Sequence, residues 1–180
     1  MASSRKTKKT VLITGATSGI GLALFDKYTD EGYDVIACGR NSEQLKLLEP
    51  RALKTLSFDV TQPNQIATSA NDLASSVSTI DILILNAGNC RYVDDVFADI
   101  INTNLTSIGY LLQNFLPKMK AGGQLVFVSS SATILPFSRS QAYGASKAGM
   151  DYLAQSLTID LKPHNIDVSL VHPGFTKTPL

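Results

Sequence analysis

The sequence has few cysteines, almost no net charge and no hydrophobic run long enough to cross a membrane. Two cysteines, Cys38 and Cys90, are too few for a disulfide scaffold and do not have the spacing of metal ligands. Sixteen Lys and Arg residues against fifteen Asp and Glu residues give a net charge of +1. This balance argues against a general nucleic-acid-binding protein, because such proteins usually carry a strongly basic face.

The N-terminus does not have the pattern of a secretion signal. Its first nine residues are rich in Lys and Arg, but the apolar stretch that follows is broken at Thr14-Gly15. We therefore expect residues 1–9 to form a disordered basic tail. Without a membrane-length apolar run, the chain is predicted to be a soluble, cytoplasmic protein with no membrane partner.

The sequence does contain enough apolar residues to form one hydrophobic core. It has 180 residues, of which 44% are apolar, so a single folded domain over residues 10–180 is expected. Short apolar runs such as Ile82-Leu83-Ile84-Leu85 are typical of strands buried on both faces. The predicted strands are Thr10–Thr14, Asp34–Cys38, Leu53–Phe58, Asp81–Leu85, Gln124–Ser129 and Asp167–Val171.

Segments with helix start and stop residues separate these runs. Ser42 is a candidate cap for a short helix that Pro50 closes, and Pro63 is tolerated at the first turn of another. The predicted helices are 19–31, 42–49, 63–77, 93–121 (ended by Gly122-Gly123) and 140–162 (ended by Pro163). Repeated strand–helix alternation predicts an α/β fold: a doubly wound parallel sheet of Rossmann type in three layers, α/β/α.

The first predicted strand runs directly into a glycine-rich turn, Thr14-Gly15-Ala16-Thr17-Ser18-Gly19-Ile20-Gly21. A turn of this kind lets the backbone approach a pyrophosphate, whose charge then rests on the N-terminus of the next helix. The spacing is Gly-x-x-x-Gly-x-Gly and not the usual Gly-x-Gly-x-x-Gly. The residues alone leave open a tight turn that uses glycine for positive φ and binds nothing.

The end of the second predicted strand bears on the choice of cofactor. In dinucleotide-binding folds an acidic side chain there accepts a hydrogen bond from the 2′-hydroxyl of NAD, whereas an arginine pairs with the 2′-phosphate of NADP. Here Gly39 stands at that place and Arg40 follows it. The pattern favours NADP(H) over NAD(H), the alternative being an arginine that is merely solvated at a strand end.

Residues 14–21 resemble the cofactor signature of the short-chain dehydrogenase/reductase family, and the resemblance extends over residues 10–180. Asp59-Val60 resembles the family's adenine-contacting pair, and Asn86-Ala87-Gly88 its Asn-Asn-Ala-Gly motif with Leu85 in the first place. His172-Pro173-Gly174 begins a segment similar to the one beside the nicotinamide. The resemblance implies these cofactor-binding residues: Gly15, Thr17, Ser18, Gly19, Ile20, Gly21, Arg40, Asp59, Val60, Asn86, Ala87, Gly88, Tyr143, Lys147, Pro173, Gly174, Thr176 and Thr178.

Of the six tyrosines, only Tyr143 is followed four residues later by a lysine, Lys147. On a helix this spacing puts both side chains on one face, and the ammonium is expected to lower the pKa of the phenol. Such pairs are also common on exposed helices, so the spacing alone leaves a structural role open. The family resemblance implies that Tyr143 is the general acid/base and that Lys147 holds the cofactor ribose while tuning Tyr143.

The resemblance implies two further catalytic residues. The family's active-site serine lies thirteen residues before the tyrosine, which is Ser130, and it hydrogen-bonds the substrate oxygen; Ser129 is expected to bond to backbone instead. Asn104 matches the family's helix asparagine, which holds a water in a proton relay. His164 and His172 are interpreted as loop and turn residues without a catalytic role.

Two departures from the family pattern affect the functional prediction. The sequence stops at Leu180, before the substrate loop and seventh strand of most members, so we expect either an incomplete chain or a minimal member. The stretch from Gly88 to Asn104 is also short. An NADP(H)-dependent carbonyl reductase or alcohol dehydrogenase acting on a small molecule is the main hypothesis. The alternative is a non-catalytic dinucleotide-binding scaffold.

The same family typically associates through its two long helices. A homodimer or homotetramer is therefore expected here through helices 93–121 and 140–162. Apolar residues in the first of them are candidates for the contact, although their helical spacing suits a core position equally well. These residues are Leu111, Leu112, Phe115 and Leu116.

Overall fold

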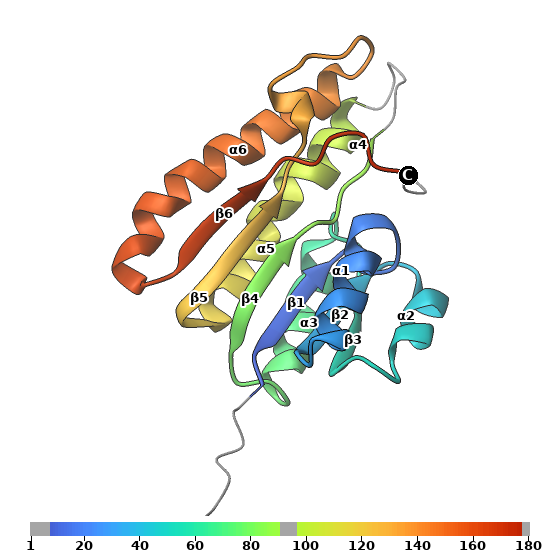
Figure 1. Ribbon diagram of the computed structural model, residues 1–180, viewed down its shortest axis with the longest axis vertical. Coiled ribbons are helices and arrows are strands. Elements are labelled where there is room, and N and C mark those ends of the chain that lie inside the picture. Colours follow the sequence, from blue (N-terminus) through green and yellow to red (C-terminus); the bar gives the residue numbers. More distant parts are fainter. Residues whose placement is uncertain (1–7, 91–96, 178–180) are drawn as a thin grey trace, which may run out of the picture.

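The computed structural model describes residues 8–90 and 97–177, and it confirms the doubly wound α/β fold (Figure 1). Six parallel strands form one sheet in the order β3-β2-β1-β4-β5-β6. The strands are β1 (Thr10–Thr14), β2 (Asp34–Gly39), β3 (Lys54–Ser57), β4 (Ile80–Leu85), β5 (Met119–Val128) and β6 (Asp167–Val171). The strand order reverses between β1 and β4, which is where sheets of this kind open a crevice for ligands.

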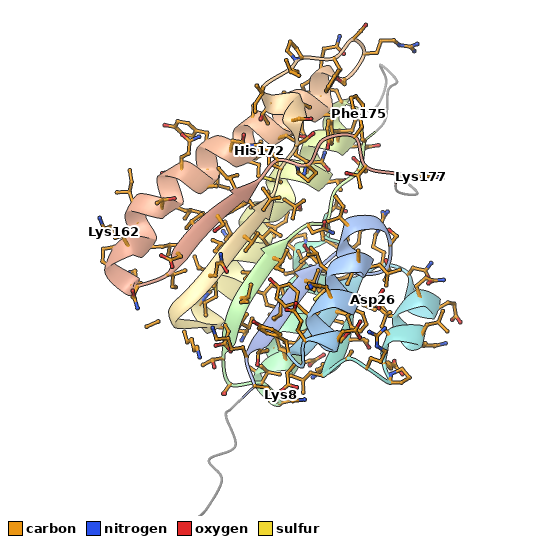
Figure 2. All side chains as sticks on the ribbon, viewed as in Figure 1. Lys8, Asp26, Lys162, His172, Phe175 and Lys177 are labelled. Carbon is orange, nitrogen blue, oxygen red and sulfur yellow. The ribbon has the colours of Figure 1, made fainter. Side chains whose placement is uncertain are left out.

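Helices pack on both faces of this sheet. The helices are α1 (Gly19–Asp30), α2 (Ser42–Leu48), α3 (Pro63–Ala74), α4 (Phe97–Ile101), α5 (Ser107–Phe115) and α6 (Gln141–Leu161). Alternate residues of β1 face opposite cores, so that Leu12 packs with α3, α5 and α6, while Val11 and Ile13 pack with α1 and α2. In Figure 2 the side chains fill the space between the sheet and its helices. Across the described residues, no helix combines the length and hydrophobicity that crossing a bilayer requires.

The prediction of one long helix over 93–121 is wrong in two respects. Its first residues, 93–96, lie outside the described ranges. The helix ends at Phe115, because Pro117 has no N–H to continue the hydrogen-bond ladder, and a 3₁₀ turn over Leu116–Lys118 follows. Gly122 and Gly123 accordingly lie inside β5, which begins at Met119 and not at Gln124.

This helix is also interrupted in its middle by a π-helical turn over Asn102–Thr106. The Ser107 N–H donates to the carbonyl of Asn102, five residues earlier, so the turn is wider than that of an α-helix. Asn104 lies at the centre of this turn and is fully buried. Nothing in the spacing of apolar residues distinguishes such a turn from a regular helix.

Smaller corrections concern helix ends. Asn41, and not Ser42, caps α2, because its side-chain oxygen accepts a hydrogen bond from the Gln44 N–H at 3.1 Å. Helix α3 ends at Ala74, three residues before its predicted end. Of the predicted tail, residues 1–7 lie outside the described ranges, and Lys8 and Lys9 are exposed.

Three of the four apolar residues considered for a subunit contact belong to the core. Leu111, Leu112 and Phe115 are buried against the sheet, and Leu116 is partly buried beside them. The Phe115 ring stacks on Phe58 with 6.2 Å between centroids, joining α5 to the end of β3. Their helical spacing therefore reflects packing within the chain.

We predict that Phe115→Ala lowers the free energy of unfolding by about 3–5 kcal/mol, because it leaves a cavity beneath Phe58. Equilibrium denaturation in urea would measure the loss. The matched control is Leu47→Ala on α2, where the leucine is 69% exposed; it should change stability by no more than about 0.5 kcal/mol. Similar losses in the two variants would contradict the core position of Phe115.

Candidate active site

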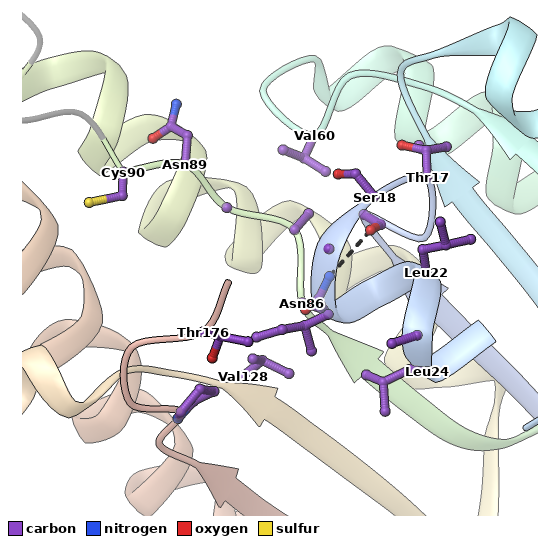
Figure 3. Close-up of a pocket in the computed structure, with 18 of the residues that line it drawn as sticks. Thr17, Ser18, Leu22, Leu24, Val60, Asn86, Asn89, Cys90, Val128 and Thr176 are labelled. Carbon is purple, nitrogen blue, oxygen red and sulfur yellow. Dashed lines mark hydrogen bonds between the residues drawn. The ribbon is translucent and has the colours of Figure 1, made fainter. Parts of the chain in front are cut away.

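A set of hydrogen bonds ties the glycine turn after β1 to the end of β4. The Thr14 hydroxyl is fully buried; it donates to the Ile84 carbonyl at 3.3 Å and accepts from the N–H groups of Asn86 and Ala87 at 3.0 and 3.1 Å. In return, the Asn86 amide donates to the carbonyls of Thr14 and Gly15 at 3.0 and 3.3 Å. Figure 3 marks a hydrogen bond from Asn86 to the turn. The crevice between β1 and β4 is thus held in one shape.

Glycine is required within this turn for conformation and for space. Gly15 has φ of 68° and Gly19 has φ of 53°, a region that side chains disfavour. A Cβ on Gly21 would lie 2.1 Å from the Gly15 carbonyl oxygen, so the first turn of α1 packs directly on the loop. Ser18 caps α1 without a side-chain hydrogen bond, which leaves the first N–H groups of the helix for an anion. These features fit a dinucleotide pyrophosphate.

The ends of β2 and β3 form the next part of the site. Arg40 is mostly exposed, and its guanidinium lies 3.5 Å from a carboxylate oxygen of Asp59. Partial burial favours a higher pKa for Asp59, but hydrogen bonds from Thr61 and the charge of Arg40 outweigh it and hold the pKa below its usual range. A Cβ on Gly39 would lie 2.7 Å from the Thr17 methyl, so a side chain at residue 39 would displace Thr17.

One cavity of about 1320 Å³ runs along the carboxyl ends of the strands. It is larger than the roughly 300–1000 Å³ of a typical small-ligand pocket, which suits a dinucleotide together with a substrate. The predicted site residues that line it are Gly15, Thr17, Ser18, Gly19, Ile20, Arg40, Val60, Asn86, Ala87, Gly88, Ser130, Tyr143, Lys147, Pro173, Gly174 and Thr176. Gly21, Asp59 and Asn104 are not among the residues that line it, and Thr178 lies outside the described residues.

Tyr143 and Lys147 both reach this cavity from α6. Burial raises the pKa of Tyr143, and a hydrogen bond with Ser130 only partly offsets that rise. The prediction that Lys147 lowers the pKa of Tyr143 is therefore wrong for the protein without cofactor, because the cost of burying the phenolate dominates. Ser130 also accepts a hydrogen bond from the Ala132 N–H at 3.1 Å, which orients its hydroxyl oxygen at the end of β5.

Lys147 is buried beside the tyrosine. Its ammonium donates to the Val128 carbonyl at 2.8 Å and lies 5.9 Å from the centre of the Tyr143 ring. Burial lowers the pKa of Lys147 to about 8, while the negative charge of Asp151 acts in the opposite direction. One of its three N–H donors is used by Val128, so two remain for other partners.

Asn104 acts as a clamp between α6 and the loop after β4. Its amide accepts from the Asn89 N–H and donates to the Asn89 carbonyl, both at 2.8 Å, and it also donates to the Ser146 hydroxyl at 3.2 Å. Ser146 in turn donates to the Tyr143 carbonyl at 2.7 Å. The side chain of Asn104 therefore fixes the wall of the cavity next to Tyr143.

Sequence reasoning missed several groups at the site. Cys90 and Asn89 line the cavity (Figure 3). Ser129 does not bond to backbone through its hydroxyl but donates to Asp151, whose second oxygen contacts His172. Because the Ser129 hydroxyl meets the carboxylate and not the imidazole, these three side chains do not form a Ser-His-Asp triad, in which the serine donates to the histidine. Asp151 follows Tyr143 by eight residues, a helical spacing that could have indicated its place.

Comparison with known proteins agrees with this geometry. The family model described as short chain dehydrogenase matches residues 9–180. An uncharacterized oxidoreductase of Schizosaccharomyces pombe is 31% identical over 97% of this chain and 63% of its own length. A probable NADP-dependent dehydrogenase of Haemophilus influenzae is 32% identical over 92% of this chain and 70% of its own. The chain thus spans less than two thirds of the length of the first of these relatives.

A solved structure shows the same arrangement in three dimensions. A short-chain dehydrogenase from Streptomyces avermitilis superposes with a TM-score of 0.88 at 30% identity. The match covers 97% of this chain and 68% of the other. The fold is therefore shared with a protein of that description.

We predict that Thr14→Val lowers the free energy of unfolding by about 2–4 kcal/mol, because the buried N–H groups of Asn86 and Ala87 lose their acceptor. Denaturant titration would measure this. Thr158→Val on the exposed side of α6 is the control, since its hydroxyl only bonds back to the Ala154 carbonyl; a change within about 0.5 kcal/mol is expected. Equal losses of stability in the two variants would show that the Thr14 hydrogen bonds between β1 and β4 stabilise the fold no more than an exposed hydroxyl does.

Proposed function

The chain belongs to the short-chain dehydrogenase/reductase family, and on that basis we propose that it is an NADP(H)-dependent oxidoreductase acting on a carbonyl or secondary alcohol. Residues 10–180 would form its NAD(P)-binding domain. The observation that carries the proposal is that Tyr143, Lys147 and Ser130 line the same cavity as the glycine turn. A dinucleotide-binding scaffold would need the turn but none of these three side chains.

The residues suited to the cofactor follow the strand ends. The turn from Gly15 to Gly21 and the N-terminus of α1 would hold the pyrophosphate, and Asp59 and Val60 the adenosine end. Asn86, Ala87 and Gly88 would lie beside the riboses, and Pro173, Gly174, Thr176 and Thr178 beside the nicotinamide. When bound, the nicotinamide supplies or accepts the hydride. The two free N–H donors of Lys147 suit ribose hydroxyls.

Tyr143 would transfer the proton at the substrate oxygen. Its raised pKa keeps the phenol protonated at neutral pH, so the protein alone is prepared to donate a proton, as carbonyl reduction requires. The Ser130 hydroxyl would stabilise the substrate oxygen as negative charge develops on it. Lys147 would favour the phenolate once Tyr143 has given up its proton, and Asn104 would keep this wall in place for proton return.

Arg40 is the residue that supports a preference for NADP(H). Asp59 contacts only one edge of its guanidinium, at 3.5 Å, so the remaining N–H donors can bind a 2′-phosphate. Gly39 leaves no acidic side chain there to accept from the 2′-hydroxyl of NAD(H). The name of the Haemophilus relative, a probable NADP-dependent dehydrogenase, is consistent with this assignment.

Association into a homodimer or homotetramer is part of the proposal. Because Leu111, Leu112 and Phe115 are used by the core, the contact would involve the outer surfaces of α5 and α6. Ile159 on α6 is 75% exposed and is a candidate contact residue.

We predict that Tyr143→Phe reduces turnover by about 10²–10⁴-fold, the usual contribution of a positioned proton donor. NADPH consumption with a panel of carbonyl compounds would measure turnover, and cofactor fluorescence would show nearly unchanged NADPH binding. Tyr152→Phe, an exposed tyrosine on the same helix, should retain full activity. Undiminished turnover of the Tyr143 variant would exclude the acid/base role, and NADPH binding without any wild-type turnover would favour a scaffold.

We also predict that Arg40→Gln weakens NADPH binding roughly tenfold while leaving NADH binding unchanged, because only the 2′-phosphate pairs with the guanidinium. Fluorescence titration with each cofactor would measure both affinities. Lys46→Gln on α2 is the control for loss of a nearby exposed positive charge. Parallel losses for NADPH and NADH would contradict the assignment of Arg40 to the phosphate.

A further inference from the structure

Large apolar side chains lie exposed on two segments beside the proposed active site. Ile134 and Leu135 are 71% and 60% exposed on the loop after β5, and Phe175 is 89% exposed on the segment after β6. Figure 2 labels Phe175 on that segment, past the end of β6. Single exposed apolar residues are ordinary on protein surfaces, whereas a group of them marks a binding surface.

The two segments contact each other, so their apolar side chains form such a group. The Ser131 N–H donates to the Pro173 carbonyl at 3.0 Å. The rings of Phe137 and Phe175 meet edge to face with 5.4 Å between their centroids, which is a favourable arrangement for aromatic rings. We call the apolar side chains of these segments the apolar rim: Ile134, Leu135, Phe137 and Phe175.

The first half of the apolar rim is fixed next to the proposed substrate-orienting serine. The N–H groups of Ile134 and Leu135 both donate to the carbonyl of Ser131 at 3.0 Å. Ser131 directly follows Ser130, whose hydroxyl is proposed above to stabilise the substrate oxygen. A single tight turn of backbone therefore separates these two apolar side chains from the reacting position.

The second half of the apolar rim is fixed to the start of α6 and to the segment beside the proposed nicotinamide site. The Ser140 hydroxyl, at the start of α6, donates to the Phe137 carbonyl at 2.8 Å. Phe175 stands between Gly174 and Thr176, which both line the cavity. The four rim side chains are not themselves among the lining residues, so the apolar rim borders the cavity and leaves its interior open.

The charged side chains that line the cavity leave little for recognition of a charged substrate. None of the described lining residues is Asp or Glu, and the lining cations are Lys27, Arg40, Lys147 and Lys177. Lys27 pairs with Glu31 at 2.8 Å, while Arg40 and Lys147 are assigned above to the cofactor. Lys177 remains, and it is exposed. One exposed ammonium contributes little binding energy in water, whereas four large apolar side chains can remove much apolar area from it.

We propose that the apolar rim binds the substrate of this site, and that the substrate is an uncharged carbonyl compound with an extended apolar part, such as a medium-chain alkyl ketone. The proposal rests on the oxidoreductase function proposed above and narrows its substrate class. The carbonyl group would lie at Tyr143 and Ser130, and the apolar part would extend out of the cavity over Leu135 and Phe175. These last two are then specificity-determining residues.

The test measures kcat/KM with NADPH for a series of ketones from 2-butanone to 2-decanone. Because complete burial of a methylene group raises affinity about fourfold, partial burial on the rim should raise kcat/KM about threefold per added methylene. Phe175→Ser and, independently, Leu135→Ser should lower this gain to about 1.5-fold. Tyr152→Ser removes an aromatic side chain that is 77% exposed on α6, and this matched control should keep the wild-type gain. The same gain in all four proteins would overturn the proposal.

A second comparison separates apolar recognition from recognition by charge. The chains of 2-octanone and 7-oxooctanoate have the same length, but only the second ends in a carboxylate. The wild type should prefer 2-octanone by about tenfold or more, because the carboxylate would lose its hydration on the rim. A preference for 7-oxooctanoate would overturn the proposal, and loss of that preference in Lys177→Met would assign the site to an anionic substrate.

Binding to the apolar rim can also be measured without turnover. The neutral ketone 6-propionyl-2-(dimethylamino)naphthalene changes its fluorescence when it leaves water. Phe175→Ser should weaken its binding about fivefold, and Tyr152→Ser should leave binding unchanged. A chain that binds this ketone through Phe175 but reduces no ketone would count against the proposed function and not against the rim. Binding that is unaffected by Phe175→Ser would overturn the role of the rim.

Light scattering on the same variants tests whether a second copy of the chain covers the apolar rim instead. Because Leu135 and Phe175 are exposed, both serine variants should fold, and thermal unfolding would verify this. Their oligomeric state should equal that of the wild type. Conversion of an oligomer to monomers by both variants, with an unchanged gain along the ketone series, would make the rim a subunit contact and overturn the proposal.

Discussion

The structure depends on the hydrogen bonds that join Thr14 to Asn86 across the point where the strand order reverses. They connect the first βα turn to the end of β4 and thereby determine the width of the crevice that α1 closes from one side. One buried hydroxyl serves three backbone groups there. The rest of the cavity lies on either side of these hydrogen bonds. It extends toward Arg40 at the end of β2 on one side and toward Ser130 at the end of β5 on the other.

The chemistry along α6 is governed by a balance between burial and charge. Burial alone would leave a neutral phenol and a weakly basic amine, which is a suitable resting state for Tyr143 but a poor one for Lys147. The carboxylate of Asp151, one turn further along the helix, only partly offsets the effect of burial on the pKa of Lys147, and its two oxygens contact Ser129 and His172 at the ends of β5 and β6. One face of α6 thus carries both the proposed proton donor, Tyr143, and the buried lysine beside it.

Much of this could be predicted from the sequence. The apolar runs predicted β1 and β6 with the ends that are observed. The glycine turn lies between the predicted strand and helix, and Tyr143 and Lys147 lie on the predicted last helix. Other features depend on contacts between distant residues. The bonds of Ser129 and His172 to Asp151 link positions 21 or 22 residues apart, and the raised pKa of Tyr143 depends on burial that local spacing does not reveal. The π-helical turn likewise coincides with the hydrogen bonds between Asn104 and Asn89, which local spacing does not reveal.

That π-helical turn makes the length of this segment matter more than its composition. Each residue advances an α-helix by roughly 100°. A π-helical turn accommodates one residue more than a regular α-helix, so deleting one residue between Asn102 and Thr106 would remove the turn and move Asn104 relative to the loop after β4. Substitutions on the outer surface of these helices would leave the clamp intact. Insertions and deletions here would instead be transmitted to the cavity wall, so the spacing between β4 and α5 is under a stricter constraint than the residues that fill it.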